Sequence, residues 1–274
     1  MINIIKQLLN KILFFLVKNL NNFSFLKLVN LILYLKKSSH SFGYCEEKKL
    51  YYIKDNLNKH FFFNRERGFS LYYQGLKSRR EQLKNSYKLG HISFKKNDLV
   101  IDCGANYGDL WLFLKDKISS NNYISFEPGI NEYKSLICNA PHSQNINEGL
   151  GDCNKFLDFY INEKDADSSV IKPISFDTIK KIKVSKLDDF IDEKKIDKIK
   201  LLKIEAEGFE PEILEGCLKN IKKFSYIAID GGNERGINQE ETMSYQLNFL
   251  LSKGFKIKEI NLNWGRALLY NANY

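Results

Sequence analysis

Apolar and polar positions change their pattern near residue 98. From there on, short apolar runs alternate with stretches whose apolar residues recur at helical spacing, which is typical of a parallel sheet covered by helices on both faces. The strands expected in the main sheet are 99–103, 123–126, 146–150, 199–204, 226–229, 256–260 and 267–270, with added strands at 156–162 and 182–184. Helices are expected at 110–117, 131–137, 186–191, 211–220 and 240–253. The pattern predicts an α/β domain over residues 98–274.

The first 40 residues show helical periodicity instead. Apolar residues between Ile5 and Leu20 share one helix face while lysines gather opposite. A second amphipathic helix is expected at 23–37, with an apolar face made of Leu26, Leu28, Val29, Leu31, Ile32 and Leu35. The apolar run is too short to span a bilayer, and no small-residue cleavage site follows it. Residues 1–37 fit two interpretations equally well: docking on an anionic membrane surface, or a helix pair that packs on the domain or forms a dimer. We therefore predict an amphipathic helical extension over 1–40.

Residues 41–97 are rich in aromatic and basic side chains, and they contain a helical pattern at about 71–89. This segment predicts a helical lead-in to the main domain. The 274 residues are 43% hydrophobic and 27% charged, which excludes wholesale disorder. The net charge of +9 is uneven, because residues 1–40 hold six lysines and no acidic residue. Lysines of the C-terminal half alternate with acidic residues, so we expect no nucleic-acid partner.

The cysteines and histidines offer little chemistry. Five cysteines are widely spaced without a C-x-x-C pair, which supports neither a disulfide framework nor a zinc site. We therefore expect a reducing, cytoplasmic location, with peripheral contact to the inner face of the membrane if 1–37 docks there. The four histidines lie outside the expected strand ends, so surface or capping roles are predicted for them.

Residues 99–108 carry the strongest functional signal. They read as a buried strand that ends at Asp102, followed by a turn of small residues and a helix that starts near Asp109. A nucleoside cofactor lies at this end of the first strand, where Gly or Ala lets it approach the backbone. Asp102 would repel a pyrophosphate and attract the cationic amino-acid end of S-adenosylmethionine, so charge favours the methyl donor over NAD. Nineteen residues after Gly108, Glu127 ends the second strand, where a carboxylate can accept both ribose hydroxyls.

Residues 98–270 resemble the FkbM family of methyltransferases, because the segment 99–108 and several later segments follow one another in the order found in that family. The segments that carry the resemblance are 101–108 (IDCGANYG), 126–128 (FEP), 147–152 (NEGLGD), 168–169 (SS), 184–190 (VSKLDDF) and 202–214 (LKIEAEGFEPEIL). The resemblance implies a Rossmann-like class I methyltransferase fold with a mostly parallel seven-stranded sheet. It also implies S-adenosylmethionine as donor and O-methylation, often of sugars in surface polysaccharide or natural-product pathways.

The donor-site candidates follow from the motif and the resemblance together. They are Asp102, Gly104, Ala105, Asn106, Gly108, Glu127, Pro128, Gly149 and Leu150. Two positions depart from the family pattern: Glu205 stands where Asp is usual, and residues 230–233 (DGGN) stand where an acidic residue and a His are more usual. These departures concern the acceptor and its deprotonation, and they leave the donor site unchanged.

The catalytic candidates are Lys203, Glu205 and Glu207, whose alternation on one strand predicts that they share a face at the carboxyl edge of the sheet. Methyl transfer is an in-line displacement that needs alignment and a base. We assign Glu205 as base or acceptor anchor, Glu207 as a partner near the donor's amino group or the acceptor, and Lys203 as the group that holds a carboxylate. The alternative is an ion-paired strand end. Glu205, Asp230 and Asn233 also form a hypothetical Mg²⁺ site made of hard oxygen ligands.

Together these observations predict a methyltransferase that acts on a hydroxyl of a sugar or glycan intermediate in surface polysaccharide biosynthesis. Two alternatives remain open. The same site could methylate a nitrogen or a phosphate oxygen of another small molecule. The chain could instead be a non-catalytic nucleoside-binding or membrane-docked interaction protein that keeps the fold. The acceptor and the oligomeric state cannot be deduced from the sequence.

Overall fold

The computed structural model describes residues 19–56, 58–162 and 168–273. The amphipathic helix predicted between Ile5 and Leu20 lies almost entirely outside the described residues. The second predicted helix, 23–37, corresponds to α2 (Asn22–Leu35). No helix in the described part of the chain is long and apolar enough to cross a membrane.

A seven-stranded sheet forms the centre of the molecule, in the order β14-β15-β11-β10-β4-β5-β6. Strand β15 runs antiparallel to both of its neighbours, and the other pairings are parallel. This order and direction confirm the predicted Rossmann-like, mostly parallel sheet. The strands are β4 (Val100–Cys103), β5 (Tyr123–Phe126), β6 (Gln144–Ile146), β10 (Ile199–Ile204), β11 (Phe224–Asp230), β14 (Phe255–Asn261) and β15 (Arg266–Asn271).

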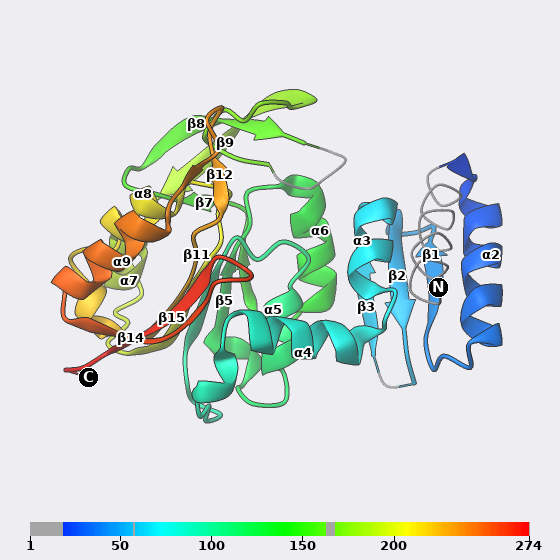
Figure 1. Ribbon diagram of the computed structural model, residues 1–274, viewed down its shortest axis with the longest axis horizontal. Helices are drawn as coiled ribbons and strands as arrows, with labels where there is room; N and C mark the ends of the chain where they lie inside the picture. The colour runs from blue at the N-terminus through cyan, green and yellow to red at the C-terminus, as the bar shows by residue number, and fades with distance from the viewer. Residues whose placement is uncertain (1–18, 57, 163–167, 274) are drawn as a thin grey trace.

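Helices cover both faces of this sheet (Figure 1). One face packs against α4 (Leu76–Ser86), α5 (Asp109–Leu114) and α6 (Ile130–Asn139), and the other against α7 (Leu187–Glu193), α8 (Glu210–Glu215) and α9 (Met243–Ser252). Because side chains alternate along a strand, Val100 and Leu201 join the first core while Ile101 and Leu202 join the second. Short 3-10 helices follow at η1 (Leu89–His91), η2 (Ser120–Asn122) and η3 (Ile221–Lys223).

The strand predicted at 146–150 is split between two sheets. Gln144–Ile146 pairs with β5, whereas β7 (Gly149–Leu150) pairs with β9 (Thr178–Ser185), which in turn pairs with β8 (Lys155–Ile161). Between the two parts, Asn147 Nδ2 donates to the carbonyls of Glu127 and Pro128, at 2.8 and 3.1 Å. These bonds fix the chain as it leaves the main sheet. The helix predicted at 240–253 begins only at Met243, because β13 (Glu240–Glu241) pairs with β12 (Asn233–Arg235).

The predicted helical lead-in is wrong for residues 41–62. They form a three-stranded antiparallel sheet of β1 (Ser41–Cys45), β2 (Leu50–Lys54) and β3 (Lys59–Phe62). Aromatic side chains favour strands, and cross-strand pairs such as Tyr44–Tyr51 and Tyr52–Phe61 stabilise this sheet. The helix predicted at 71–89 is two helices, α3 (Arg65–Tyr72) and α4, which are separated at Gly75, where φ is +89°.

Helix α2 packs on the small sheet through a face that differs from the predicted one. Phe25, Val29 and Leu33 are buried with Phe42, Phe62 and Phe69 in a core of their own. The predicted apolar face included Leu31 and Leu35, which are 54% and 70% exposed. Figure 1 shows the resulting layers: α2, the small sheet, then α4 to α6, the main sheet, and the helices of its far face.

Candidate functional site

A cavity lies beyond the carboxyl ends of β4, β5 and β10, with about 1130 Å³ of empty space when the solvent at its open mouth is included. Most of the predicted site residues line it: Asp102, Gly104, Ala105, Asn106, Glu127, Pro128, Gly149, Leu150, Lys203, Glu205 and Glu207. Gly108, Asp230 and Asn233 are not among its lining residues. The structure thus brings two separate sets of candidates, those for the donor and those for catalysis, to one cavity.

The turn after β4 depends on glycine. Gly104 has a φ of +70°, and a Cβ built on it would lie 1.8 Å from the carbonyl oxygen of Glu205. The Gly104 and Ala105 amides both donate to the Phe126 carbonyl, at 3.0 and 3.1 Å, so the turn is tied to the end of β5. Gly108 has a φ of +82° and is the N-cap of α5, where a Cβ would touch Leu136. Gly108 therefore shapes the turn but does not form the wall of the cavity.

Glu127 directly follows β5, and its carboxylate accepts hydrogen bonds from two backbone amides. Oε2 accepts from the Asn106 amide at 2.8 Å, and Oε1 accepts from the Gly129 amide at 2.7 Å. Burial disfavours the charged form and, with the nearby Glu132, raises the pKa of Glu127 to about 8. The carboxyl group therefore bridges the ends of β4 and β5 and titrates near neutral pH.

Asp102 points into the protein and is 1% exposed. Its Oδ1 lies 3.1 Å from Lys203 Nζ, and the Tyr123 hydroxyl donates to Oδ2. Burial raises the pKa of Asp102, while Lys203 opposes that shift. The charge of the motif predicts direct attraction between Asp102 and the donor's cationic end. The geometry favours a different role, because this carboxylate already neutralises and positions Lys203.

Lys203 links Asp102 to Glu205. Lys203 Nζ lies 2.9 Å from Glu205 Oε2 and donates to the Gly104 carbonyl at 2.7 Å. Burial would lower the pKa of Lys203, but the two carboxylates outweigh that effect and raise it. Burial would likewise raise the pKa of Glu205, yet Lys203 and Arg266 hold it well below its usual range. Glu205 is therefore ionised and only weakly basic.

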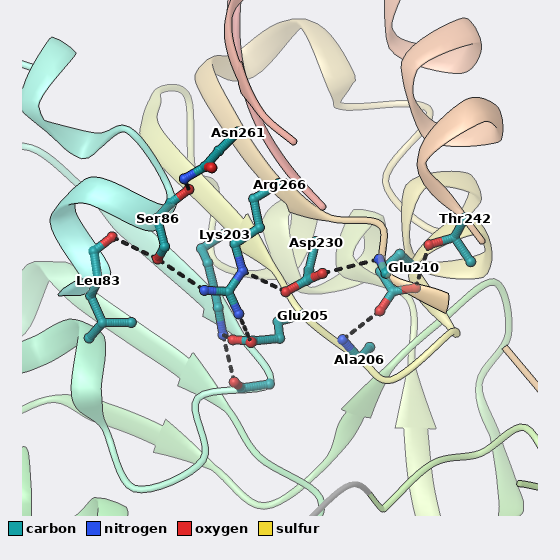
Figure 2. Close-up of polar contacts among 12 residues, drawn as sticks. Leu83, Ser86, Lys203, Glu205, Ala206, Glu210, Asp230, Thr242, Asn261 and Arg266 are labelled. Atoms are coloured by element: carbon teal, nitrogen blue, oxygen red, sulfur yellow. Dashed lines mark hydrogen bonds and ion pairs between the residues drawn. The ribbon is translucent and has the colours of Figure 1, made fainter. Parts of the chain in front are cut away.

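Arg266 of β15 completes this arrangement, which we call the sheet-tip cluster (Lys203, Glu205, Asp230 and Arg266). Figure 2 shows the Arg266 guanidinium between the two carboxylates, 2.6 Å from Glu205 Oε1 and 2.6 Å from Asp230 Oδ2. Its Nη1 also donates to Ser86 Oγ at 2.9 Å. A cationic side chain thus lies where the sequence analysis placed Mg²⁺.

The magnesium hypothesis is corrected by these contacts. Arg266 already pairs with Glu205 and Asp230, and Asn233 is exposed on β12. Among the described residues, no group of three or more His, Cys, Asp or Glu side chains is arranged to hold a metal ion. The prediction that Glu205 and Asp230 are neighbours matches the geometry, but their partner is a guanidinium.

The loop after β10 is held by a residue that the sequence analysis missed. Strand β10 ends at Ile204, so Glu205 and Glu207 lie in a loop instead of alternating on the strand, and Glu207 has a φ of +50°. Glu210, which is 1% exposed, accepts from the Ala206 and Gly208 amides at 2.8 and 3.1 Å. Thr242 Oγ1 donates to its other carboxylate oxygen (Figure 2). These bonds fix the loop that presents Glu205.

The segment before residue 98 also forms part of the wall, which the sequence analysis did not predict. Its contributors are Arg67, Leu71, Arg79, Leu83 and Tyr87. Tyr87 is 1% exposed, and burial together with the nearby Glu205 carboxylate raises the pKa of its hydroxyl. The Arg266 guanidinium lies 4.1 Å from the centre of the Tyr87 ring. Only the helical pattern at 71–89 hinted that this segment was ordered, and nothing local placed it at the cavity.

A second buried cluster, which we call the α5 clamp, joins this segment to the turn. Asp109, the first residue of α5, lies 2.9 Å from His60 Nε2 and accepts from the Tyr72 hydroxyl at 2.6 Å. Its Oδ2 accepts from Arg79 Nε at 2.7 Å. Burial alone would raise the pKa of Asp109, but Arg79 and His60 outweigh it and lower the pKa. His60 is 1% exposed, so the surface or capping role predicted for it is wrong.

A family model described as the methyltransferase FkbM domain matches residues 102–257. The chain belongs to the FkbM methyltransferase family. The FkbM domain begins at Asp102 and includes Glu127, Lys203 and Glu205, whereas the wall residues from Arg67 to Tyr87 precede the matched region. Among curated proteins, none matches this FkbM methyltransferase.

Solved structures match part of the chain at low identity. A methyltransferase FkbM from Methylobacillus flagellatus is 20% identical over 66% of this chain, with a TM-score of 0.43. The chain spans 45% of that protein's length. TrmK of M. capricolum, in complex with S-adenosylhomocysteine, is 14% identical over 70% of this chain and 69% of its own, with a TM-score of 0.41.

Proposed function

We propose that this FkbM methyltransferase transfers a methyl group from S-adenosylmethionine to a hydroxyl of a sugar or glycan intermediate in surface polysaccharide biosynthesis. The observation that supports it best is the single cavity that joins the Gly104 turn, the carboxyl group of Glu127 and the anionic Glu205. The first two suit a nucleoside donor, and the third suits a hydroxyl acceptor.

The donor half of the proposed site consists of the turn and the ends of β5 and β7. Backbone at Gly104, Ala105 and Asn106 allows close approach of the donor, and Glu127 would accept hydrogen bonds from its ribose hydroxyls. Pro128, Gly149 and Leu150 provide a wall for the base. Bound S-adenosylmethionine supplies an electrophilic methyl group on a sulfonium.

The acceptor half of the proposed site is centred on Glu205. In the transfer, a carbon–oxygen bond forms as the carbon–sulfur bond breaks, and S-adenosylhomocysteine is released. Glu205, whose pKa is held low by Lys203 and Arg266, orients the hydroxyl by accepting its hydrogen bond. The methylated oxygen is then far more acidic than any carboxylic acid, so even a weakly basic Glu205 can receive its proton and pass it to solvent. Glu207 lies at the same cavity and is proposed as a partner of the donor's amino group or of the acceptor.

The charge of the wall favours a hydroxyl over a phosphate oxygen. Its described residues include seven carboxyl groups, of which Glu127 is largely protonated at neutral pH because its pKa is raised to about 8, and three cationic side chains. A phosphate group inside the cavity would meet this excess of negative charge, which also disfavours nucleic-acid acceptors. We therefore retain an uncharged sugar hydroxyl as the acceptor. Methylation of a nitrogen remains the alternative reaction.

The location and the role of the N-terminal extension are also proposals. We propose a cytoplasmic protein that contacts an anionic membrane through residues 1–37. The outward side of α2 supports this proposal, because it exposes Phe23, Leu31 and Leu35. A liposome pelleting assay with the L31S/L35S variant tests it, and equal pelleting of the variant and the wild-type chain would contradict it.

The central experiment has two stages. Calorimetry measures binding of S-adenosylmethionine, and labelled donor is then incubated with a panel of oligosaccharides and nucleotide sugars. We expect binding of the donor and label transfer to a hydroxyl of a panel member. Absence of donor binding at millimolar concentration would exclude the enzyme and favour a non-catalytic protein. Label that is found on nitrogen would replace the acceptor proposed here.

A further inference from the structure

Arg79 of α4 lines the cavity in a fixed orientation. Its Nε and Nη2 lie 2.7 and 2.6 Å from Asp109 Oδ2, and its Nη1 donates to Gln82 Oε1 at 2.8 Å. The side chain is 15% exposed. His60 and Tyr72 in turn hold Asp109, so the α5 clamp fixes the orientation of the Arg79 guanidinium.

These contacts do not use all the N–H donors of the Arg79 guanidinium. An arginine has five N–H groups, and a lysine ammonium has three. The contacts of Arg79 with Asp109 and Gln82 leave one N–H on each terminal nitrogen without an acceptor among the described residues. Lys203, the cation at the base of the cavity, already faces Asp102, Glu205 and the Gly104 carbonyl. Arg79 is therefore better suited than Lys203 to bind an additional anion.

The position of Arg79 matches one end of an extended donor. Its partner Asp109 directly follows the 104–108 turn. Against the effect of burial, Asp109, and to a smaller extent Glu205 at the tip of β10, raise the pKa of Arg79. Glu127, the proposed ribose ligand, lies one strand away on the other side of the turn. A donor whose ribose is at Glu127 therefore has room to extend its amino-acid end past the turn toward α4.

We propose that Arg79 binds the carboxylate of the methyl donor's amino-acid end. This inference rests on the proposed function, since it assumes an S-adenosylmethionine donor. In a cavity rich in carboxylates, an anionic group needs a cation held in place, and a guanidinium can offer a carboxylate two parallel hydrogen bonds. The proposal places a donor-binding residue 23 positions before the region matched by the family model.

The test compares two nucleosides that differ in this group. S-adenosylhomocysteine carries the carboxylate, whereas 5′-methylthioadenosine lacks the amino-acid end. Calorimetry with the full chain measures both affinities for the wild type and for R79Q. We expect R79Q to weaken S-adenosylhomocysteine binding about tenfold to a hundredfold, as for loss of a hydrogen bond between charged groups. Binding of 5′-methylthioadenosine should stay unchanged.

Arg80→Gln is the matched control. Arg80 is the next residue of the same helix and pairs with Asp116 at 2.8 Å on the surface. R80Q should leave both affinities unchanged. If R79Q does not fold, as judged by urea unfolding, R79K takes its place. R79K keeps a cation beside Asp109 but lacks the fork, so it should selectively weaken S-adenosylhomocysteine binding several-fold.

Three results would overturn the inference. Equal losses for both nucleosides would mean that Arg79 only shapes the turn. Unchanged binding of both would mean that it contacts neither. A selective loss in R67Q instead would move the carboxylate to Arg67, the other guanidinium of the wall. If the wild type binds neither nucleoside nor S-adenosylmethionine, the proposed function itself fails, which is a separate outcome.

Discussion

The sheet-tip cluster and the α5 clamp border the same cavity, but they differ in where their residues come from. Glu205, Asp230 and Arg266 are brought together by three neighbouring strands of one sheet. The clamp joins Asp109 of the main domain to His60 and Arg79, which lie on elements that precede that domain. The first cluster arises from the sheet itself, whereas the second exists only when the N-terminal elements pack on α5. We therefore expect substitutions in the clamp to affect stability first and those in the sheet-tip cluster to affect chemistry first.

The largest expected effect is that of Asp109→Asn. The change removes a buried anion that faces His60, Tyr72 and Arg79, and breaking such a cluster costs about 3–5 kcal/mol of unfolding free energy. Urea denaturation measures the loss. Asp116→Asn is the control, because Asp116 pairs with Arg80 at the surface and should change stability by less than about 1 kcal/mol. Similar stabilities of D109N and D116N would show that the clamp does not stabilise the packing of the N-terminal elements on α5.

Glu205→Gln should separate chemistry from binding. The amide cannot accept a proton or keep the anionic pairing with Lys203 and Arg266, so we expect turnover to fall roughly a hundredfold or more. The assay uses labelled donor with the acceptor that the panel identifies. Glu212→Gln is the control, since Glu212 pairs with Arg235 and does not line the cavity. Full activity of E205Q would leave the cluster with a purely structural role.

Glu127 predicts a pH dependence with a defined sign. Its pKa is raised from 4.5 to about 8, so the folded state holds the proton more tightly than the unfolded state. The resulting stabilisation is complete below about pH 4.5 and is lost as pH rises toward 8. Donor affinity should change in the opposite direction and rise several-fold between pH 7 and 9, because the carboxylate is the better acceptor for ribose hydroxyls. Calorimetry across this range measures the rise, and Glu127→Gln should abolish both trends.

The smallest effect is expected for Tyr87→Phe. The hydroxyl lies near the Glu205 carboxylate, which keeps Lys203 and Arg266 as partners, so its removal should change the unfolding free energy by only about 1 kcal/mol. The ring, which packs against Arg266, is retained. If the hydroxyl contacts the acceptor, KM for that acceptor should rise by about twofold to threefold while donor affinity stays constant. A marked loss of stability would instead indicate that the hydroxyl stabilises the fold.

The parts of the site that could be predicted from the sequence are those encoded by local pattern. The strand before Asp102, the glycine turn and the strand that ends at Glu127 are each defined within a few residues, and their order fixes their place at the sheet edge. Arg79 and Tyr87 could not be placed in this way. They reach the cavity only through packing between segments far apart in the chain, which no periodicity records.

The errors have physical causes as well. Residues 41–62 pair through aromatic cross-strand contacts, and their short strands lack a clean alternation of buried and exposed positions. The Mg²⁺ hypothesis was based on the oxygen ligands of Glu205 and Asp230. It did not include Arg266, whose guanidinium reaches these carboxylates because β15 pairs antiparallel with β11. In both cases the missing information was a partner from a distant segment.

Glu210 binds the loop that carries Glu205 with two amide hydrogen bonds, so this side of the cavity is built as a rigid frame. The opposite side of the cavity is formed by helices α3 and α4, which are not part of the main sheet. Directed evolution toward new acceptors should therefore concentrate its libraries on positions such as Leu71, where pocket shape can vary while the proposed donor site is kept.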